Sequence, residues 1–516
     1  MFSKRLLFVL FFVLVIADIL RAQRIVYSEP EKDDSRRMVF EIIGKIDGNF
    51  LIYKNLKGKN WIAIYDNDMK QVSKVGQEFM PDERLVSVDF FPYTDFFYAI
   101  YQYQKKNVVH CMAAKIDGLG KKISEVVELD TTHIGFSAND KIYSVITSED
   151  KSKFMVFKIN SKNKDNFVIT TNLFNDSLQL LKRSVINMPM DDRNDYLDEY
   201  YVDNDGDFVF AKFYRQNSDV ISRAMLVVKY AQVDTFSMNE LNIEKRLLDE
   251  VHVKIDNIHK RYFLTSFYYK ERRGNIDGFY YYVWDKSSGK PEMENTVTFG
   301  EELRRDAKGD ANIKMAFNDY FIRNIIVKKD GGFIIGSEAF YTTSRYNAWN
   351  RWDYLYGSPY YSPYDYYSYS PYYNSLWYRS RYYNSQNVRY HADNIVIFSF
   401  DRSGNLQWNN VISKDQFDDD TDDLISYQLM NTGGQLHFLF NMEERRVNLL
   451  NDYTVAPGGQ IARNPTLKNL DKGYEFMAKY GKQVSARQMI VPCVYRNSVC
   501  FAKIELTNKT NIHPYP

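Results

Sequence analysis

Short apolar runs alternate with polar turn residues along almost the whole chain, and the 3.6-residue periodicity of an amphipathic helix is nearly absent. One pattern recurs: a turn rich in Asp, Asn and Gly, an apolar strand, a second polar turn, and another strand that ends near an Asp. Clear copies begin at Asp47, Asp205, Asp330 and Asn431, and weaker copies begin near Phe96, Lys141 and Arg261. The copies recur roughly every 45–55 residues, a spacing typical of propeller repeats.

A single meander of three or four strands cannot bury both of its faces, so repeated meanders stack face to face around an axis until the ring closes. The repeats therefore predict an all-β chain that folds as a β-propeller of about seven blades, within a range of six to eight. Two β domains divided near residue 310 would produce similar strand spacing and are the alternative architecture.

The sixth predicted blade contains a long Tyr-rich, low-complexity insertion at residues 341–393. Its prolines and the lack of period-2 apolar alternation argue against further strands, and loops of this length are typically either functional or disordered. Tyr-rich surfaces offer large contact areas at low entropic cost, whereas a loop without any partner is the alternative. The predicted contact residues are Tyr360, Tyr361, Tyr364, Tyr366, Tyr367, Tyr372, Tyr373 and Trp377.

Two segments of this predicted blade carry a family resemblance. Residues 330–336 read Asp-Gly-Gly-Phe-Ile-Ile-Gly, and residues 397–408 lead through Asp401 and Gly404-Asn405 to Trp408. These segments resemble a repeat of secreted bacterial β-propeller proteins, and the chain is similar to uncharacterised envelope propellers of bacteria that glide or use type IX secretion. The resemblance implies a propeller fold and an envelope or extracellular location, and it implies no activity.

The N-terminus has the features of a secretory signal. Lys4 and Arg5 precede an apolar run that ends at Ala17, and the small residue Ala22 follows. The run is shorter than the ~20 apolar residues that span a bilayer, so we expect cleavage rather than a retained anchor, and no transmembrane segment afterwards. We therefore expect a protein exported to the periplasm, the outer membrane or the extracellular space. Its predicted parts are a signal peptide (1–22), a β-propeller (23–507) and a C-terminal tail (508–516).

Composition narrows the class of partner. The formal net charge is +1, which argues against nucleic acid because nucleic-acid-binding domains carry a clear basic excess. The aromatic content of 16%, with 42 Tyr, favours strands over helices.

Two of the three Cys flank a predicted hairpin turn. If the turn at Arg496-Asn497 has two residues, Cys493 and Cys500 face each other across neighbouring strands. A disulfide formed after export and a reduced, packed pair are both consistent with this spacing.

Asp203, Asp205 and Asp207 alternate along the chain, and alternating carboxylates suit Ca²⁺, the one cofactor that the sequence suggests. However, Gly206 falls at the fourth position rather than at the sixth position of an EF-hand loop, and Tyr214 stands at the twelfth. A plain blade turn is therefore the favoured interpretation. A second acidic run, residues 418–423, is typical of a solvated loop, although it would also attract cations or a basic partner.

The sequence contains no HExxH, GxSxG, Walker A or GxGxxG motif, and this leaves no catalytic residue to nominate. The resulting hypothesis is a non-enzymatic scaffold or binding protein of the cell envelope that engages a protein complex or a glycan. A secreted propeller hydrolase or lyase acting on polysaccharide is the alternative. Two carboxyl groups facing each other near the axis would favour that alternative.

Overall fold

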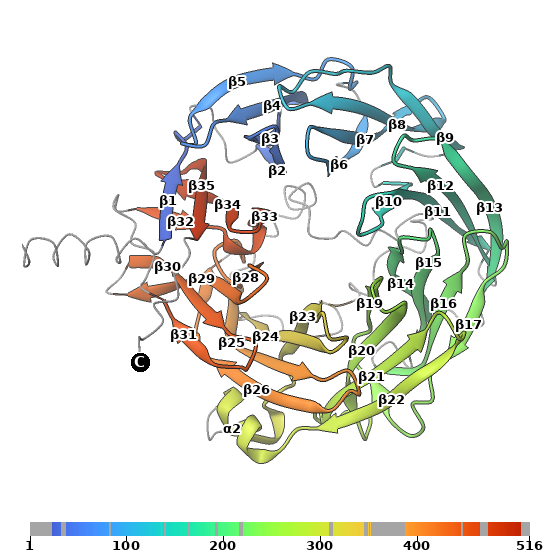
Figure 1. The fold of residues 1–516 in the computed structure, drawn as a ribbon, viewed down its shortest axis with the longest axis vertical. Helices are drawn as coiled ribbons and strands as arrows, with labels where there is room; N and C mark the ends of the chain where they lie inside the picture. Colours follow the sequence, from blue (N-terminus) through green and yellow to red (C-terminus); the bar gives the residue numbers. More distant parts are fainter. Residues whose placement is uncertain are drawn as a thin grey trace, which may run out of the picture.

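The computed structural model describes residues 23–506 apart from residues 32–37, 82–83, 136, 139–140, 164–165, 191–193, 216–219, 309–312, 345–348, 350, 352–354, 356–387, 420, 445–446 and 465–472. The predicted signal peptide and the predicted tail lie outside the described residues. Within them, strand pairing forms seven antiparallel sheets, and the nine-stranded sheet contains two consecutive meanders. The strands therefore group into eight units of four, arranged in a ring (Figure 1).

The first four units are consecutive meanders. Unit one contains β2 (Val39–Ile46), β3 (Asn49–Leu56), β4 (Lys59–Tyr65) and β5 (Gln71–Gly76). Unit two contains β6 (Leu85–Pro92), β7 (Phe96–Lys105), β8 (Val108–Asp117) and β9 (Val127–His133). Unit three contains β10 (Ser144–Thr147), β11 (Lys153–Asn163), β12 (Asn166–Asn175) and β13 (Leu180–Pro189). Unit four contains β14 (Asp195–Val202), β15 (Phe208–Arg215), β16 (Ile221–Lys229) and β17 (Ser237–Glu240).

The two-residue strand β18 (Leu247–Leu248) pairs with β16 and β20 and so joins units four and five into one sheet. Unit five contains β19 (His252–Asp256), β20 (Arg261–Tyr269), β21 (Gly278–Asp285) and β22 (Lys290–Thr298). The helices α2 (Glu301–Lys308) and η3 (Ile313–Met315) lead to unit six, which contains β23 (Tyr320–Val327), β24 (Phe333–Ser344), β25 (Val388–Phe400) and β26 (Leu406–Ile412). The short strand β27 (Phe417–Asp419) adds to the end of β25.

Unit seven contains β28 (Gln428–Asn431), β29 (Leu436–Glu444), β30 (Val447–Val455) and β31 (Ile461–Arg463). Unit eight contains β33 (Lys482–Ser485), β34 (Gln488–Tyr495), β35 (Ser498–Leu506) and, from the other end of the chain, β1 (Gln23–Tyr27). The short strand β32 (Tyr474–Phe476) also pairs with β34, and η4 (Ala478–Tyr480) follows it.

The core consists of clusters between neighbouring units. Successive side chains of a strand point to opposite faces, so each sheet presents one apolar set to each neighbour. In β3, Leu51 and Tyr53 pack with unit two, whereas Phe50 and Ile52 pack with unit eight. Eight such clusters link the eight units in turn around the ring. The architecture is therefore β-propeller-like, and the cluster between units five and six spans residue 310, which contradicts two domains divided there.

The recurrent Asp marks a specific turn. In the turn after β25, the amide of Gly404 donates to the carbonyl of Asp401 at 3.0 Å, and one carboxylate oxygen of Asp401 accepts the amide of Asn405 at 2.8 Å. Gly404 adopts a positive φ of 78°, where glycine is favoured because it has no Cβ. The turn after β14 repeats this arrangement at Asp203 and Gly206. The sequence pattern thus reflects a side chain that holds a tight hairpin together.

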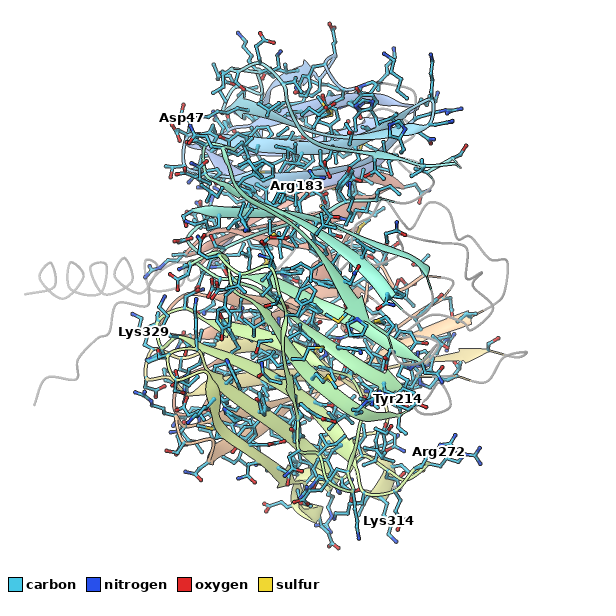
Figure 2. The ribbon with its side chains drawn as sticks, turned by 90° about the vertical axis from the view of Figure 1, so that its right-hand side faces the viewer. Asp47, Arg183, Tyr214, Arg272, Lys314 and Lys329 are labelled. Atoms are coloured by element: carbon cyan, nitrogen blue, oxygen red, sulfur yellow. The ribbon has the colours of Figure 1, made fainter. Side chains whose placement is uncertain are left out.

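The two faces of the ring differ. Turns between the first and second strands and between the third and fourth strands of each unit lie on one face, which we call the tight-turn face. Asp47 and Lys329 lie on this face in Figure 2, whereas Tyr214, Arg272 and Lys314 lie on the opposite, long-loop face. The long-loop face carries the connections between units and the turns between second and third strands. Because the insertion joins β24 to β25, the second and third strands of unit six, it leaves from the long-loop face.

The strands extend further into the insertion than its predicted boundaries. Residues 341–344 continue β24 and residues 388–393 belong to β25, so that only residues 345–387 separate the two paired strands. Tyr341, Thr342 and Thr343 suit a strand, since aromatic and β-branched side chains pack well on a pleated surface.

The ring closes through β1. Its five residues pair with β35, and Tyr27 stacks on Tyr474 with ring centroids 4.2 Å apart. Just beyond the strand, the amide of Phe501 donates to the hydroxyl of buried Ser28 at 3.0 Å.

Removing residues 23–28 from the mature chain should lower its free energy of unfolding by at least about 3 kcal/mol, because buried apolar area and several backbone hydrogen bonds disappear together. Urea denaturation of chains that begin at residue 23 and at residue 29 would measure the loss. Arg24→Gln is the matched control, since it removes an exposed charge that pairs with Asp68 but keeps β1 in place, and it should cost about 0–1 kcal/mol. Equal stability of the two chains would show that β1 does not close the ring.

Candidate functional site

The predicted contact residues of the insertion, from Tyr360 to Trp377, lie outside the described residues. The structure does describe three residues at the start of the insertion: Trp349, Arg351 and Leu355. Trp349 and Leu355 pack against an apolar cluster formed by Phe321, Phe340, Ala392 and Ile425. The base of the insertion is therefore fixed on unit six.

Arg351 anchors this base to two units. Its guanidinium forms a bidentate ion pair with Asp249, which lies between β18 and β19 and has no solvent exposure. It also donates to the carbonyl oxygens of Asn318 and Tyr320 at the start of unit six, and it lies 3.7 Å from the ring centroid of Phe321. Burial opposes the charge of Arg351, but Asp249 outweighs burial and raises the pKa of the guanidinium. Planar, bidentate pairs of this kind fix geometry as well as charge.

A second buried ion pair lies beside the exit strand of the insertion. The ammonium of Lys414 is 2.9 Å from a carboxylate oxygen of Glu338 on β24, and both side chains are almost completely buried. Lys414 also donates to the carbonyl oxygen of Ala392 on β25 at 2.6 Å. Burial lowers the pKa of Lys414, an effect that Glu338 opposes. A buried cation thus anchors the start of the insertion, and a second one lies between the two strands that flank it.

Next to this anchor, His252 lies between two carboxylates. Its Nδ1 is 3.4 Å from Glu199 on β14, and its Nε2 is 3.1 Å from Glu250. The other oxygen of Glu250 accepts the amide of Ile322 on β23 at 2.6 Å. Burial of the imidazole opposes its protonation, but the two carboxylates outweigh burial and raise the pKa of His252 well above its ordinary value. The imidazolium therefore links the first strands of units four, five and six.

Charged groups also occur on the first strands of the other side of the ring. Burial raises the pKa of Glu41 on β2 to about 7; Lys482 on β33 opposes this shift and Asp89 on β6 adds to it. Asp89 in turn lies 3.3 Å from the ammonium of Lys141. In unit four, burial and the neighbouring Glu199 raise the pKa of Asp198 to about 6. Sequence reasoning missed all of these groups because their residues are dispersed along the chain and no local motif relates them.

Asp203, Asp205 and Asp207 do converge, but on a lysine. The ammonium of Lys286 is 2.5 Å from a carboxylate oxygen of Asp203 and 2.7 Å from one of each of the other two. Burial opposes the charge of Lys286, but the three carboxylates raise its pKa. Within the described residues, no group of three or more His, Cys, Asp or Glu side chains is arranged to hold a metal ion. The calcium assignment stays a prediction.

Cys493 and Cys500 face each other as expected. They are directly paired across β34 and β35, with sulfur atoms 2.9 Å apart, and both side chains are fully buried. Arg496 and Asn497 both have positive φ, as a two-residue type I′ turn requires. The disulfide itself stays a prediction.

The described members of the acidic run 418–423 have partners. Asp419 pairs with Arg389, Asp422 pairs with Lys479, and the hydroxyl of Tyr480 donates to Asp423. The run therefore belongs to the structure of the long-loop face near the insertion.

No protein-family model and no curated protein matches this chain. Solved structures with a similar path include the polysaccharide lyase Uly1, with a TM-score of 0.39, 10% identity and coverage of 94% of this chain and 99% of that chain. Prolyl oligopeptidase B from Galerina marginata has a TM-score of 0.39 and 9% identity, covering 94% of this chain and 58% of that chain. An apocarotenoid oxygenase from Synechocystis has a TM-score of 0.34 and 9% identity, covering 96% and 95%.

Structural similarities this weak support no conclusion about function or fold. The β-propeller-like architecture is therefore inferred from the strand pairing of this chain itself. The helices among the described residues include none that is long and apolar enough to cross a membrane.

We expect the contribution of His252 to stability to depend on pH. Because its pKa is higher in the folded state than the ~6.5 of an unfolded chain, the stabilisation is complete below pH ~6.5 and is lost as the pH rises through the folded value. His252→Gln should therefore reduce the free energy of unfolding by on the order of 1–2 kcal/mol at pH ~5.5, and by less at pH ~9. Urea denaturation at both pH values measures this, with the exposed His133→Gln as control. A deficit that grows with pH would contradict the assignment.

Replacing Lys286 should destabilise the fold, because the three carboxylates that converge on it would lose their counter-charge. Lys286→Met is expected to lower the free energy of unfolding by about 3–5 kcal/mol, because buried charges lose their partner. Lys260→Met is the control, since Lys260 is exposed and pairs with Asp205, the exposed member of the three carboxylates, and its loss should cost about 0–1 kcal/mol. Millimolar CaCl₂ should restore part of the stability of Lys286→Met and leave the parent protein unchanged. Comparable stabilisation of the parent protein would show that calcium binds beside the lysine.

Proposed function

We propose that this chain is an exported, eight-bladed β-propeller that serves as a non-enzymatic scaffold or binding protein of the cell envelope. It engages an envelope protein complex or a glycan through its long-loop face, in the periplasm, at the outer membrane or outside the cell. The N-terminal signal pattern supports export. The family resemblance of residues 330–336 and 397–408 supports an envelope location.

The observation that carries this proposal is the anchored base of the Tyr-rich insertion. A segment of 43 residues, 345–387, separates two directly paired strands. Near its start, Arg351 forms a buried ion pair with Asp249, and a buried pair of Lys414 and Glu338 lies within the strands that flank it. A loop that served only to connect two paired strands would need no such anchors, since a two-residue turn suffices. A fixed base instead places the start of the insertion at a defined position on one face, and Tyr side chains suit such a position because they supply contact area.

Deleting residues 356–387 and joining the ends with a short Gly-Ser linker should leave the ring intact and abolish partner capture. This deletion keeps Arg351 and Leu355, so the melting temperature should change by only a few degrees. Tagged parent and deleted proteins, expressed at native level, would be purified from gently solubilised envelopes and their stoichiometric partners quantified.

A stoichiometric partner that is retained by the deleted protein would exclude the insertion from the binding function. An uncleaved N-terminus in the purified protein would contradict export by a cleavable signal, whereas a mature chain that begins at Gln23 supports it.

The alternative, a polysaccharide hydrolase or lyase, is favoured by one observation. Glu41 has a pKa of about 7 and lies on the first strand of unit one, with Asp89 on the first strand of unit two as an electrostatic neighbour. A carboxyl group with a raised pKa beside a second carboxylate is the arrangement used in glycoside cleavage. Turnover of a polysaccharide by the parent protein but not by Glu41→Gln would replace the scaffold proposal with this one.

A further inference from the structure

The strands that flank the insertion form an exposed platform with a regular arrangement of side chains. β24, β25 and β27 lie side by side in unit six, and their register places residues directly opposite one another. Tyr341 of β24, His391 of β25 and Phe417 of β27 form one row across the three strands. Since opposed residues of an antiparallel sheet point to the same side, these three rings share one face.

A second row lies two residues further along each strand and, because side chains alternate with period two, on the same face. It consists of Thr343, Arg389 and Asp419. Arg389 forms a bidentate ion pair with Asp419 at 2.8 and 3.1 Å. The platform therefore has an aromatic row beside a row of hydrogen-bonding groups.

Contacts within the platform hold these side chains in place. The rings of Tyr341 and His391 stack with centroids 4.5 Å apart and planes inclined by 5°. The guanidinium of Arg389 lies 4.4 Å from the ring centroid of Phe417. On the opposite face of the same strands, Phe340 and Ala392 are buried in the cluster at the base of the insertion. The inner face of the platform thus packs against the core, while the side chains of its outer face contact solvent.

Exposure of these groups calls for an explanation. The side chain of Phe417 is 51% exposed, and the paired Arg389 and Asp419 are 46% and 60% exposed. We propose that the platform of β24, β25 and β27 binds a neutral oligosaccharide, with the aromatic row stacked on the apolar faces of sugar rings and the polar row bonded to their hydroxyl groups. This inference deepens the proposed function, on which it rests, by naming the class of ligand.

Charge argues for a neutral ligand. Arg389 and Asp419 form an ion pair, so this guanidinium is already neutralised and is not available to a carboxylate or a sulfate. Asp393 and Asp415 both act on the titration of Tyr341 and thus add negative charge near the aromatic row. Carboxyl groups at this position disfavour an anionic polysaccharide and favour a neutral one. The aromatic row crosses three strands, a width of roughly 10 Å at the usual strand spacing, which suits an extended chain of sugar rings rather than a single small molecule.

The test is isothermal titration of the mature chain, residues 23–516, with cellohexaose, laminarihexaose, mannohexaose and xylohexaose. Hexagalacturonate represents an anionic ligand, and a heptalysine peptide represents a basic protein segment. We expect binding of at least one neutral hexasaccharide, weakened at least tenfold by Phe417→Ala and measurably by Asp419→Asn. The control is Ile258→Ala, which removes a 74% exposed side chain from the turn between β19 and β20 on the tight-turn face and should leave binding unchanged.

Thermal melting of every variant separates a loss of binding from a loss of structure. If Phe417→Ala proves to be unfolded, the isosteric Asp419→Asn variant still tests the platform. Three outcomes would overturn the inference. The first is that no neutral hexasaccharide binds, and the second is that only hexagalacturonate or heptalysine binds. The third is that a neutral hexasaccharide binds equally well to the parent protein and to both platform variants. The protein lacking residues 356–387 distinguishes the two proposals. If it still binds the sugar but no longer captures the partner, both hold, whereas sugar binding with unchanged partner capture removes only the role of the insertion.

Discussion

The structure depends on the fact that every sheet of the ring is apolar on both faces. A strand such as β3, with consecutive buried residues from Phe50 to Tyr53, has no side that tolerates water. Each unit therefore requires a neighbour on both sides, and only a closed ring satisfies all of them at once. This constraint explains why the first strand of the chain completes the last unit. It also explains why the Asp-stabilised turns are tight, because short turns allow neighbouring sheets to pack without loops between them.

Charged side chains play a different part. Around the first strands of the units, where successive sheets converge, ionic groups from different units meet: His252 with Glu199, and Arg351 with Asp249. Ion pairs of this kind contribute less to stability than apolar burial, but they require a particular geometry, and removal of one partner is costly. They therefore define how neighbouring units are positioned, and at the sixth unit they also define where the insertion begins.

The repeat could be predicted from sequence because it is local. The turn at Asp401 and Gly404 is formed by five consecutive residues, and the hairpin that places Cys493 opposite Cys500 is formed by eight. Both features could therefore be predicted from neighbouring residues alone. The number of units was harder, since the eighth is assembled from both ends of the chain and its first strands are short. The charged groups were not predictable at all. Lys286 meets Asp203 across 83 positions, and a lone lysine carries no signal that it will satisfy three carboxylates. The platform on unit six was hidden for the same reason, because β27 joins β25 only after an intervening strand.

The pairing of β1 with β35 has a consequence for how the molecule acquires its structure. Ser28 and Phe501 are separated by 473 positions and yet bond to each other. Contacts of such sequence separation form late, because the entropy of closing the loop must be overcome before they contribute anything. While the chain folds, successive units can pack on one another, but the ring stays open until β1 and β35 have paired. The open arc has two unpaired apolar faces, one at each end, and these are the surfaces on which a chaperone would act.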